Sequence, residues 1–500
     1  HAERLSAQVL VELRKALRCA CLSIFRRNMH PGYTNISIMG SYVTLCGGQL
    51  LGWQEMLDYG VSRFTKAWEY TMKNGTFAEY NSPTYTVEAI MDLSRIHAQI
   101  HNEDVHRMSG DMLDVAWKTV AEHFHAPTRQ WTGPNARSYT YLTADGTLSF
   151  LRNALDNGEA LIADDRFAYS LQWPYIPMQC PEKYRQAFAV CEPHDVNLGF
   201  TTGQSIRAPR DTIAIAHIAL EYALSSWEIS STWNQRRNLL GFWGGQQPRF
   251  INATILHDFY DFSSGMFVTV QQGGNALLVA SLQSDGGDTH PSLDMIHNET
   301  IRAYDLRVRI ELGGAVAAQP VVTPERAVLE DGGIRLNIAL LGAQFDGAPV
   351  HLSLWNTQMD LRQQEAHANP HRRFVGDEPR WYVDVVFYHG EEREIPLRAL
   401  KDDGAFCGFS FIMRHEEMIY LFYLAVRQDQ RRKGYGSALL DDLFQQYPHH
   451  CICTDIESPQ PQADNQLQRL QRRRFYLDRG FADTGYGNLW YGVRYDILAA

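Results

Sequence analysis

The sequence predicts a multidomain protein with an all-α unit, an antiparallel β unit and a carboxy-terminal α/β unit. Apolar residues recur at helical spacing over about the first 200 residues. Short runs of β-branched and aromatic residues, separated by Gly-Gly and Asp-Gly turns, follow them. The last 120 residues or so then hold a strand, a glycine-bearing turn and a helix in direct succession. A chain of 500 residues also implies two to four domains.

Residues 1–205 are predicted to form antiparallel helical hairpins arranged as an (α/α) toroid. Apolar residues of the first helix share one face, and five further segments have helical length. The face is formed by Val9, Leu10, Leu13 and Leu17, and the segments are 36–51, 53–72, 87–100, 112–124 and 148–155. Unlike ordinary turns, the loops at 31–35, 79–85 and 130–139 are crowded with Tyr, Asn and Arg. Such loops are candidates for a binding surface.

Residues 206–360 are predicted to form an antiparallel β-sandwich. The expected strands favour β-branched and aromatic residues and are separated by short polar turns. They cover 212–223, 267–272, 276–282, 300–312 and 334–341. The polar stretch 361–379 is rich in Gln, Arg, His and Pro and is predicted to be a linker. The α/β domain is then expected over 380–500.

The most informative stretch follows the predicted strand 419–426. Gly434 and Gly436 come after a polar turn and precede a helix with an apolar face. Unpaired backbone N–H groups at such a helix N-terminus converge on a phosphate, and glycine lets a pyrophosphate approach the backbone. Arg431, Arg432 and Lys433 add positive charge beside it. A glycine pair after a strand is weak evidence alone, but its surroundings strengthen it.

The order Arg431-x-x-Gly434-x-Gly436 resembles the acetyl-CoA pyrophosphate loop of the GNAT N-acetyltransferase superfamily. Downstream, Phe475-Tyr476 and Gly480-Phe481 match the FYxxxGF signature of that family. The resemblance implies that 451–457 is a strand splayed from its neighbour, that 495–498 closes the sheet and that 391–400 is the first helix. It covers about the last 120 residues.

This resemblance assigns roles to individual residues. Backbone amides of 432–437, which include Ser437, would bind the pyrophosphate of acetyl-CoA, and Leu424 and Val426 would pair with its pantetheine arm. Tyr476 would protonate the departing thiolate, and Glu457 would be the general base. Asn465 would hold a water molecule or the pantetheine arm. Simpler alternatives stay open: Tyr476 as a packing residue against Phe481, Glu457 as a solvated carboxylate and Asn465 as a helix N-cap.

Residues 1 to about 350 resemble the heparinase-like polysaccharide lyases, through their architecture and their NSPTYT-like and GPxxRxY-like loops. Such a lyase neutralises a uronate carboxylate and moves its α proton. Asn35, Asn81 and Arg137 are candidates for the first task. Tyr80, Tyr85 and Tyr139 are candidates for the second. Ile36 follows Asn35 where these lyases usually place a His, so a toroid that binds carbohydrate or only acts as a scaffold is the alternative.

Composition excludes several classes of protein. The net charge of −11 and the pI near 5.9 argue against a nucleic-acid-binding protein. No apolar run reaches the roughly 18 residues that span a bilayer. The eight cysteines form no CxxC pair, so we expect buried free thiols, no metal site and a cytoplasmic location. The chain begins at His1 without Met, which leaves a removed secretory segment open.

The sequence therefore predicts an acetyl-CoA-dependent N-acetyltransferase whose other units present an amine substrate or bind a partner. The first alternative is a uronate lyase or carbohydrate-binding protein with an appended acetyltransferase domain. The second is a non-catalytic assembly protein in which both modules are degenerate. The identity of the amine and the oligomeric state are not encoded in any motif of the sequence.

Overall fold

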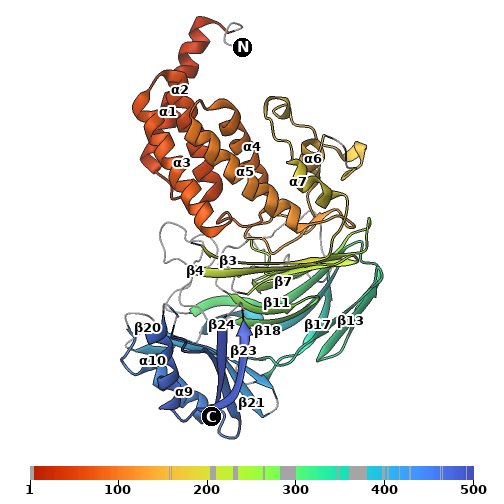
Figure 1. The fold of residues 1–500 in the computed structure, drawn as a ribbon. Coiled ribbons are helices and arrows are strands. Elements are labelled where there is room, and N and C mark those ends of the chain that lie inside the picture. Colours follow the sequence, from red (N-terminus) through yellow and green to blue (C-terminus); the bar gives the residue numbers. More distant parts are fainter. Residues whose placement is uncertain are drawn as a thin grey trace.

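The computed structural model describes residues 5–156, 158, 160–202, 210–228, 235–262, 265–281, 300–345, 348–357, 359, 380–396, 400–402, 405–415, 417–426, 430–461, 463, 465–490 and 493–500. The predicted linker 361–379 lies outside these residues. Figure 1 shows a helical unit, a large twisted sheet in the middle of the molecule and a smaller α/β unit at the carboxy terminus.

The amino-terminal unit is built from helical hairpins. Its helices are α1 (Ala7–Arg27), α2 (Thr34–Leu51), α3 (Gln54–Asn74), α4 (Pro83–Gln99), α5 (Glu103–His123), α6 (Asp145–Ala154) and α7 (Glu182–Arg185). Short 3-10 turns η2 (Asp164–Arg166), η3 (Trp173–Tyr175) and η4 (Gln186–Phe188) and the pair β1 (Phe124–His125) and β2 (Gln130–Trp131) complete it. Ser82 and Asn102 cap α4 and α5, while Gly52 and Gly75 end α2 and α3 in the left-handed conformation. The core includes Phe64, Leu93 and Trp117.

The central sheet is antiparallel and has nine strands. Its order is β17-β18-β11-β7-β6-β5-β4-β3, with β8 paired to β7. The strands are β3 (His194–Thr202), β4 (Arg210–Ile218), β5 (Tyr222–Trp227), β6 (Leu239–Trp243), β7 (Arg249–His257), β8 (Tyr260–Asp261), β11 (Thr300–Gly314), β17 (Leu352–Asn356) and β18 (Trp381–Pro396). Smaller strands are β9 (Met266–Gln272), β10 (Asn275–Ser281), β12 (Val321–Val322), β13 (Arg326–Asp331), β14 (Ile334–Ala339), β15 (Gln344–Phe345) and β16 (Ala348–Pro349).

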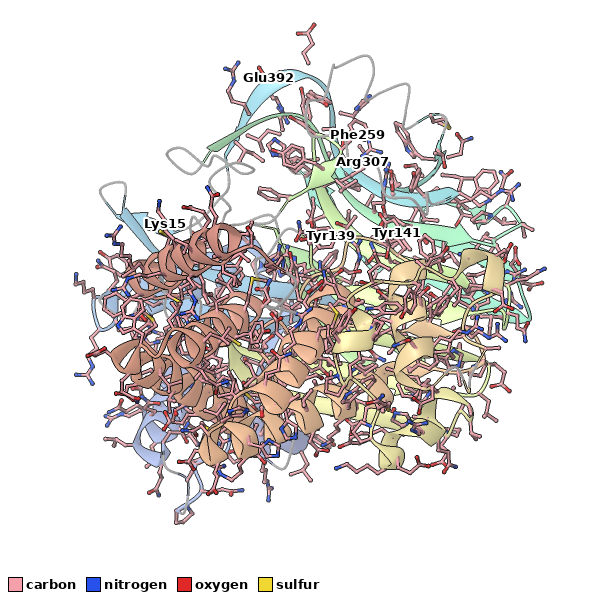
Figure 2. The ribbon with its side chains drawn as sticks, turned by 90° about the horizontal axis from the view of Figure 1, so that it is seen from above. Lys15, Tyr139, Tyr141, Phe259, Arg307 and Glu392 are labelled. Carbon is pink, nitrogen blue, oxygen red and sulfur yellow. The ribbon has the colours of Figure 1, made fainter. Side chains whose placement is uncertain are left out.

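The two faces of the central sheet differ in character. On one face, Ile255 and Leu306 share an apolar core with Ala327 and Leu329 of β13. The other face buries a row of charged residues on β11. The guanidinium of Arg307 is fully buried, lies between the rings of Phe259 and Trp355 and pairs with Asp305 and Asp384. Figure 2 shows Arg307 and Phe259 together on this sheet.

The carboxy-terminal unit has a six-stranded sheet in the order β19-β20-β21-β22-β24-β23. Its elements are β19 (Leu400–Asp402), β20 (Ala405–His415), β21 (Met418–Val426), α9 (Tyr435–Gln446), β22 (Cys451–Glu457), α10 (Gln466–Leu477), β23 (Ala482–Trp490) and β24 (Val493–Ala499). Both helices pack on one face, where Leu440 of α9 and Tyr476 of α10 join the core around Ile419 and Ile452. The elements expected for 419–426, for the helix after Gly434 and for 451–457 are therefore present.

The helix predicted for 391–400 is wrong. These residues continue β18 as far as Pro396, and β18 pairs with β11 from Thr300↔Pro396 to Leu312↔Trp381. Glu and Arg favour helix locally, but Ile395 is buried opposite Ile301, and this long-range pairing decides the structure. Two smaller expectations also change. The segment 212–223 is divided between β4 and β5, and the helical region ends before β3.

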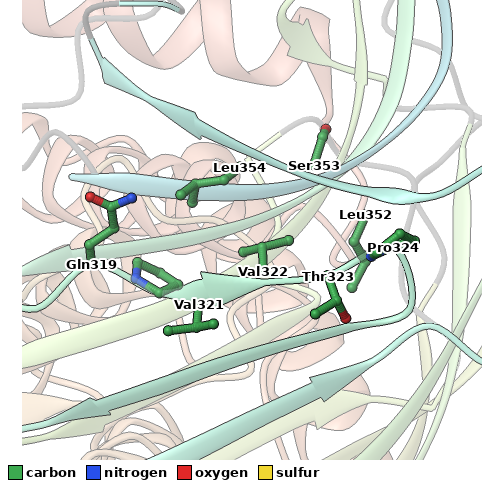
Figure 3. A pocket seen from close by; sticks show the side chains of 9 residues that line it. Gln319, Val321, Val322, Thr323, Pro324, Leu352, Ser353 and Leu354 are labelled. Carbon is green, nitrogen blue, oxygen red and sulfur yellow. The ribbon is translucent and has the colours of Figure 1, made fainter.

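The cysteines whose side chains the structure describes are free. They are Cys19, Cys21, Cys46, Cys180, Cys191, Cys451 and Cys453. Among the described helices, none is both long and apolar enough to cross a membrane. Within the same residues, no cluster of three or more His, Cys, Asp or Glu side chains is arranged to hold a metal ion. A pocket of about 580 Å³ lies between β12 and β17 (Figure 3), but its lining contains no charged side chain, so we assign it no catalytic role.

Candidate active site

The strands β21 and β22 are parallel neighbours that part after a short paired stretch. Their register covers only Met418↔Cys451, Ile419↔Ile452 and Tyr420↔Cys453. One residue further, Thr454 Oγ1 donates to the carbonyl oxygen of Leu421 at 2.9 Å. Beyond that point the edge of β21 that faces β22 has no strand partner among the described residues. The result is a wedge-shaped gap in the sheet.

Each strand keeps its other neighbour through the gap. β21 stays paired with β20 as far as Gly408↔Val426, and β22 stays paired with β24 as far as Glu457↔Tyr495. β21 also carries a bulge, because Phe411 pairs with Tyr423 and Ile412 with Leu421, which leaves Phe422 as an extra residue. A bulge increases the local twist and turns a strand away from its neighbour. The predicted cofactor residues Leu424 and Val426 lie on the free edge.

The turn after β21 opens the N-terminus of α9 to an anion. Arg432 and Gly434 adopt positive φ angles of 66° and 93°, and Gly434 is the N-cap without a side-chain cap. The first-turn N–H groups of Gly436 and Ser437 donate to none of the described residues. A Cβ at Gly434 would meet nothing within 4 Å, so the space before the helix is open. Such a helix end attracts negative charge.

Three exposed cations surround this turn. Arg431 Nε donates to the carbonyl oxygen of Val426 at 3.3 Å, and Lys433 Nζ donates to Gln430 Oε1 at 2.7 Å. Neither they nor Arg432 forms an ion pair with a carboxylate in the described part of the chain. Together with the helix end they form a basic site, and their role in binding a pyrophosphate stays a prediction.

Tyr476 lies beside the point where the strands part. Its side chain is buried, and its ring packs edge-on against Phe475 and Phe481 with centroids 5.2 Å away in each case. Burial raises the pKa of the Tyr476 hydroxyl, and a hydrogen bond with the Thr454 side chain partly offsets this. The hydroxyl is therefore protonated at neutral pH and next to the residue that bridges the two strands. The ring of Tyr476 therefore packs on Phe481, as the simpler alternative expects, and its role as an acid stays a prediction.

Glu457 ends β22 among hydrogen-bond donors. Its carboxylate lies 3.6 Å from Arg469, 3.3 Å from Arg472 and 3.4 Å from the Asn465 amide nitrogen. Asn465 is the N-cap residue of α10, but its side chain caps no N–H group and instead accepts from Arg469 Nε at 2.6 Å. Glu457 is therefore not simply solvated, because its carboxylate is paired with cations of α10.

Sequence reasoning missed the residues that become neighbours of Glu457 only through strand pairing. Tyr495 of β24 is the cross-strand partner of Glu457, and Asp455 lies on the same face of β22. Burial is the main cause that raises the pKa of Tyr495. The carboxylates of Glu457, Asp455 and Glu228, which comes just after β5, raise it further. A period-two pattern could show that Asp455 and Glu457 share a face, but it could not place Tyr495 or Glu228 beside them.

In the helical unit, four of the six predicted lyase residues come together around Glu79. The Glu79 carboxylate accepts from the Asn35 backbone N–H at 2.8 Å and from Arg137 at 3.2 Å. The Arg137 guanidinium stacks over Tyr85 and donates to the Tyr139 hydroxyl at 3.1 Å, which is 2.5 Å from the Tyr85 hydroxyl. Burial raises the pKa of Glu79 and of Tyr85. Tyr139 is well exposed, so the cluster reaches the surface (Figure 2).

The other two predicted lyase residues are buried and hydrogen-bonded inside the helical unit. Tyr80 is buried with its hydroxyl 2.9 Å from His123 Nε2. The Asn81 amide donates to the carbonyl oxygens of Thr132 and Pro134 and accepts from Trp131 Nε1. These bonds fasten the loop after α3 to the loop after β2. Neither side chain faces a substrate-sized opening, because each is about 1% exposed.

Two family models match the chain. Residues 2–151 match a domain of unknown function, DUF8769, and residues 397–483 match the Acetyltransferase (GNAT) domain. No curated protein matches. An N-acetyltransferase from Staphylococcus aureus Mu50 is 16% identical, with 18% of this chain and 43% of that chain covered and a TM-score of 0.15. Ard1 from Thermoplasma volcanium is 22% identical, with 20% of this chain and 64% of that chain covered and a TM-score of 0.17. The ribosomal-protein-S18-alanine N-acetyltransferase from Escherichia coli is 15% identical, with 30% of this chain and 92% of that chain covered and a TM-score of 0.17.

The chain thus spans 43% and 64% of the first two of these proteins. At these identities and TM-scores the alignments carry no information on activity, so the assignment depends on the family model. The model covers β19 to the start of β23, which includes the parted strands, the open helix end and Tyr476. The carboxy-terminal part of the chain is a GNAT acetyltransferase domain.

Proposed function

We propose that the protein is an acetyl-CoA-dependent N-acetyltransferase, with its helical and central β units presenting the amine or binding a partner. The observation that carries this proposal is the gap between β21 and β22, which opens beside the uncapped N-terminus of α9. Because acetyl-CoA is present in the cytosol, the protein would act in the cytoplasm.

The chain fits the cofactor at two places. The free N–H groups of Gly436 and Ser437, with Arg431, Arg432 and Lys433 around them, suit a diphosphate. The free backbone edge at Leu424 and Val426 suits the amide groups of a pantetheine arm, which could pair with it as a strand would. Acetyl-CoA would supply an acetyl group activated as a thioester.

The remaining chemistry is proton transfer and positioning. Tyr476, kept protonated by burial, would donate a proton to the departing sulfur. Glu457 would accept the proton of the amine, directly or through water, once Arg472 releases it. Asn465 would keep Glu457 in place through the shared contact with Arg469. Each role suits the side chain and its surroundings, and none requires a covalent enzyme intermediate.

A substitution at Gly434 tests the binding site. Gly434→Glu adds bulk and negative charge at the helix N-terminus and forces a side chain into a φ of 93°. We expect acetyl-CoA to bind the wild-type full chain in calorimetry and the variant to lose at least about tenfold in affinity. The full chain is needed because β18 belongs to the central sheet. Unchanged affinity in the variant, or no binding to the wild type at about millimolar cofactor, would contradict the proposal.

A second candidate function belongs to the helical unit. The exposed Tyr139 hydroxyl, 2.5 Å from that of Tyr85 and bonded to Arg137, is the arrangement that favours uronate lyase chemistry or carbohydrate binding. A lyase would release an unsaturated product from uronate polysaccharides, and its absorbance would rise with time. Tyr139→Phe should abolish this rise, whereas Tyr169→Phe, at another exposed tyrosine, should not. No absorbance change with any uronate polymer would leave binding alone as the role of this cluster.

A further inference from the structure

A pocket of about 560 Å³ lies in the helical unit, where the chain folds back over the end of α6. It is lined by Asn153, Ala154 and Asp156 at the end of α6, and by Tyr169 and the segment 173–179. Its volume lies within the roughly 300–1,000 Å³ that is usual for small-molecule sites. Figure 1 shows α6 on the opposite side of the central sheet from the carboxy-terminal unit, so this pocket is separate from the gap between β21 and β22.

The segment that lines the pocket is fastened to the end of α6. The Cys180 N–H, just after this segment, donates to the Ala154 carbonyl oxygen at 2.8 Å. Arg185 joins the same two parts, because its Nε donates to the Cys180 carbonyl oxygen at 3.2 Å and its guanidinium donates to Asp156 at 2.6 Å. Two prolines within the segment fix the φ angle there. The shape of the pocket is therefore set by the fold.

The charges at the pocket are already paired. Asp156 is the only carboxylate among the described lining residues, and it pairs with Arg185 at 2.6 Å. Glu182 pairs with the same guanidinium at 3.3 Å. Arg185 is thus shared by two carboxylates, and the described lining offers no cation to an acidic ligand and no unpaired carboxylate to a basic one. The pocket therefore favours an uncharged ligand.

Three polar side chains of the lining have no hydrogen-bond partner within the described part of the chain. They are Asn153, Trp173 and Gln179. Trp173 is only 8% exposed although it lines the pocket, and its Nε1 is a donor. Asn153 is half-buried and Gln179 is exposed, and each amide carries both donors and an acceptor. Such groups suit a ligand that donates and accepts hydrogen bonds at several places.

Aromatic rings stand beside these polar groups. Tyr175 lines the pocket and is 68% exposed. Tyr169 packs edge-on against Trp173 with ring centroids 5.6 Å apart, which holds the indole ring in place. A sugar has hydroxyl groups that both donate and accept, and it has an apolar C–H face that packs on an aromatic ring. Among uncharged ligands, a saccharide therefore matches the lining best.

We propose that this pocket binds a neutral oligosaccharide. The ring of Tyr175 lies against the C–H face of one sugar, and Asn153, Gln179 and the Trp173 Nε1 form hydrogen bonds with its hydroxyl groups. The site goes beyond the proposed acetyl transfer and does not depend on it. It gives the helical unit a ligand of its own.

This site differs from the cluster around Tyr139. The two share no described residue, because that cluster is formed by the loops that carry Tyr85 and Arg137. The cluster contains the Arg137 guanidinium and suits an acidic sugar, whereas the pocket suits a neutral one. The charge of the sugar therefore distinguishes the two sites.

Calorimetry with the full chain tests the proposal. The neutral probes are cellotetraose, maltotetraose, laminaritetraose and tetra-N-acetylchitotetraose, and the acidic probe is tetragalacturonate. We expect at least one neutral probe to bind with a Kd of about 0.1–1 mM, as suits an open pocket with few hydrogen bonds. Tetragalacturonate should bind to this pocket at least about tenfold more weakly.

Substitutions then place the bound sugar. Asn153→Ala should lower the affinity about fivefold, because it removes donors and an acceptor, and Tyr175→Ala should lower it at least about tenfold. Alanine favours helix, and the Asn153 side chain has no described partner to lose, so Asn153→Ala should fold like the wild type. Gln8→Ala, at an exposed amide of α1, is the matched control and should leave the affinity unchanged.

Two results would overturn the proposal. One is that none of the four neutral probes binds the wild-type chain at about 10 mM. The other is that Asn153→Ala and Tyr175→Ala both bind the sugar as tightly as the wild type, which would place it elsewhere. A loss of binding in Tyr139→Phe alone would then assign the sugar to the Tyr139 cluster. The acetyltransferase proposal stands apart from these results, since it is tested by acetyl-CoA binding.

Discussion

At the scale of single residues, Tyr476 links the motif in the sequence to the geometry of the gap. Thr454 forms the last bond between the two strands and also a hydrogen bond with Tyr476. The buried ring, held by Phe475 and Phe481, has little freedom to move. A tyrosine hydroxyl with a raised pKa stays protonated well into the alkaline range. In the proposed reaction it could therefore donate a proton at a pH where the amine is partly deprotonated.

Tyr476→Phe should lower kcat about a hundredfold or more and leave acetyl-CoA affinity nearly unchanged, because only the proton to the leaving sulfur is lost. The measurement is steady-state thiol release together with calorimetry. Tyr486→Phe, at a tyrosine of β23 that is 75% exposed, serves as the control for an unrelated hydroxyl. A Tyr476→Phe enzyme with normal kcat would show that this tyrosine only packs.

Residue identity alone was a poor guide in the helical unit. The sequence predicts lyase roles for Tyr80, Asn81, Tyr85 and Arg137 alike, because all stand in polar, aromatic loops. Yet the first two are buried and bonded to His123 and to the loop after β2, whereas Arg137, also buried, contacts the half-buried Tyr85 and the exposed Tyr139. The hydrogen-bond partners that keep Tyr80 and Asn81 buried lie about 40 to 50 residues away along the chain. Local composition therefore cannot identify them.

At the scale of elements, the sequence predicts the helices, strands and turns whose structure depends on residues close to them in the chain. The strand at β21, the turn at Gly434 and the helices α9 and α10 each follow from periodicity, glycine and an apolar face. The end of β18 could not be predicted this way, since Ile395 is fixed by Ile301 across a strand pair. The same pairing extends the central sheet into residues assigned to the last domain. The boundaries at 205, 360 and 379 remain predictions.

At the scale of the whole molecule, a polar contact joins the helical unit to the charged face of the central sheet. Tyr141 follows the loop that carries Arg137 and stacks on Phe250 of β7 at 4.7 Å. Its hydroxyl donates to Glu311 of β11 at 2.7 Å, and Asn252 donates to the other carboxylate oxygen at 2.5 Å. Burial raises the pKa of the Glu311 carboxyl above its ordinary value of 4.5. Figure 2 shows Tyr141 close to this sheet.

Tyr141→Phe should destabilise the full chain by about 1–3 kcal/mol, because it removes a donor from a buried carboxylate while keeping the ring that stacks on Phe250.

The folded pKa of Glu311 lies above the unfolded one, so the folded state holds its proton more tightly. Stability from this group is therefore present below the ordinary value and falls as pH rises through the raised one. Losing a donor to the ionised form raises the folded pKa further, so the variant should lose stability over a wider range of pH. Urea unfolding at several pH values measures both effects. No loss at any pH would mean that Tyr141 contributes through stacking alone. An equal loss at every pH would mean that its hydroxyl does not act through the ionisation of Glu311.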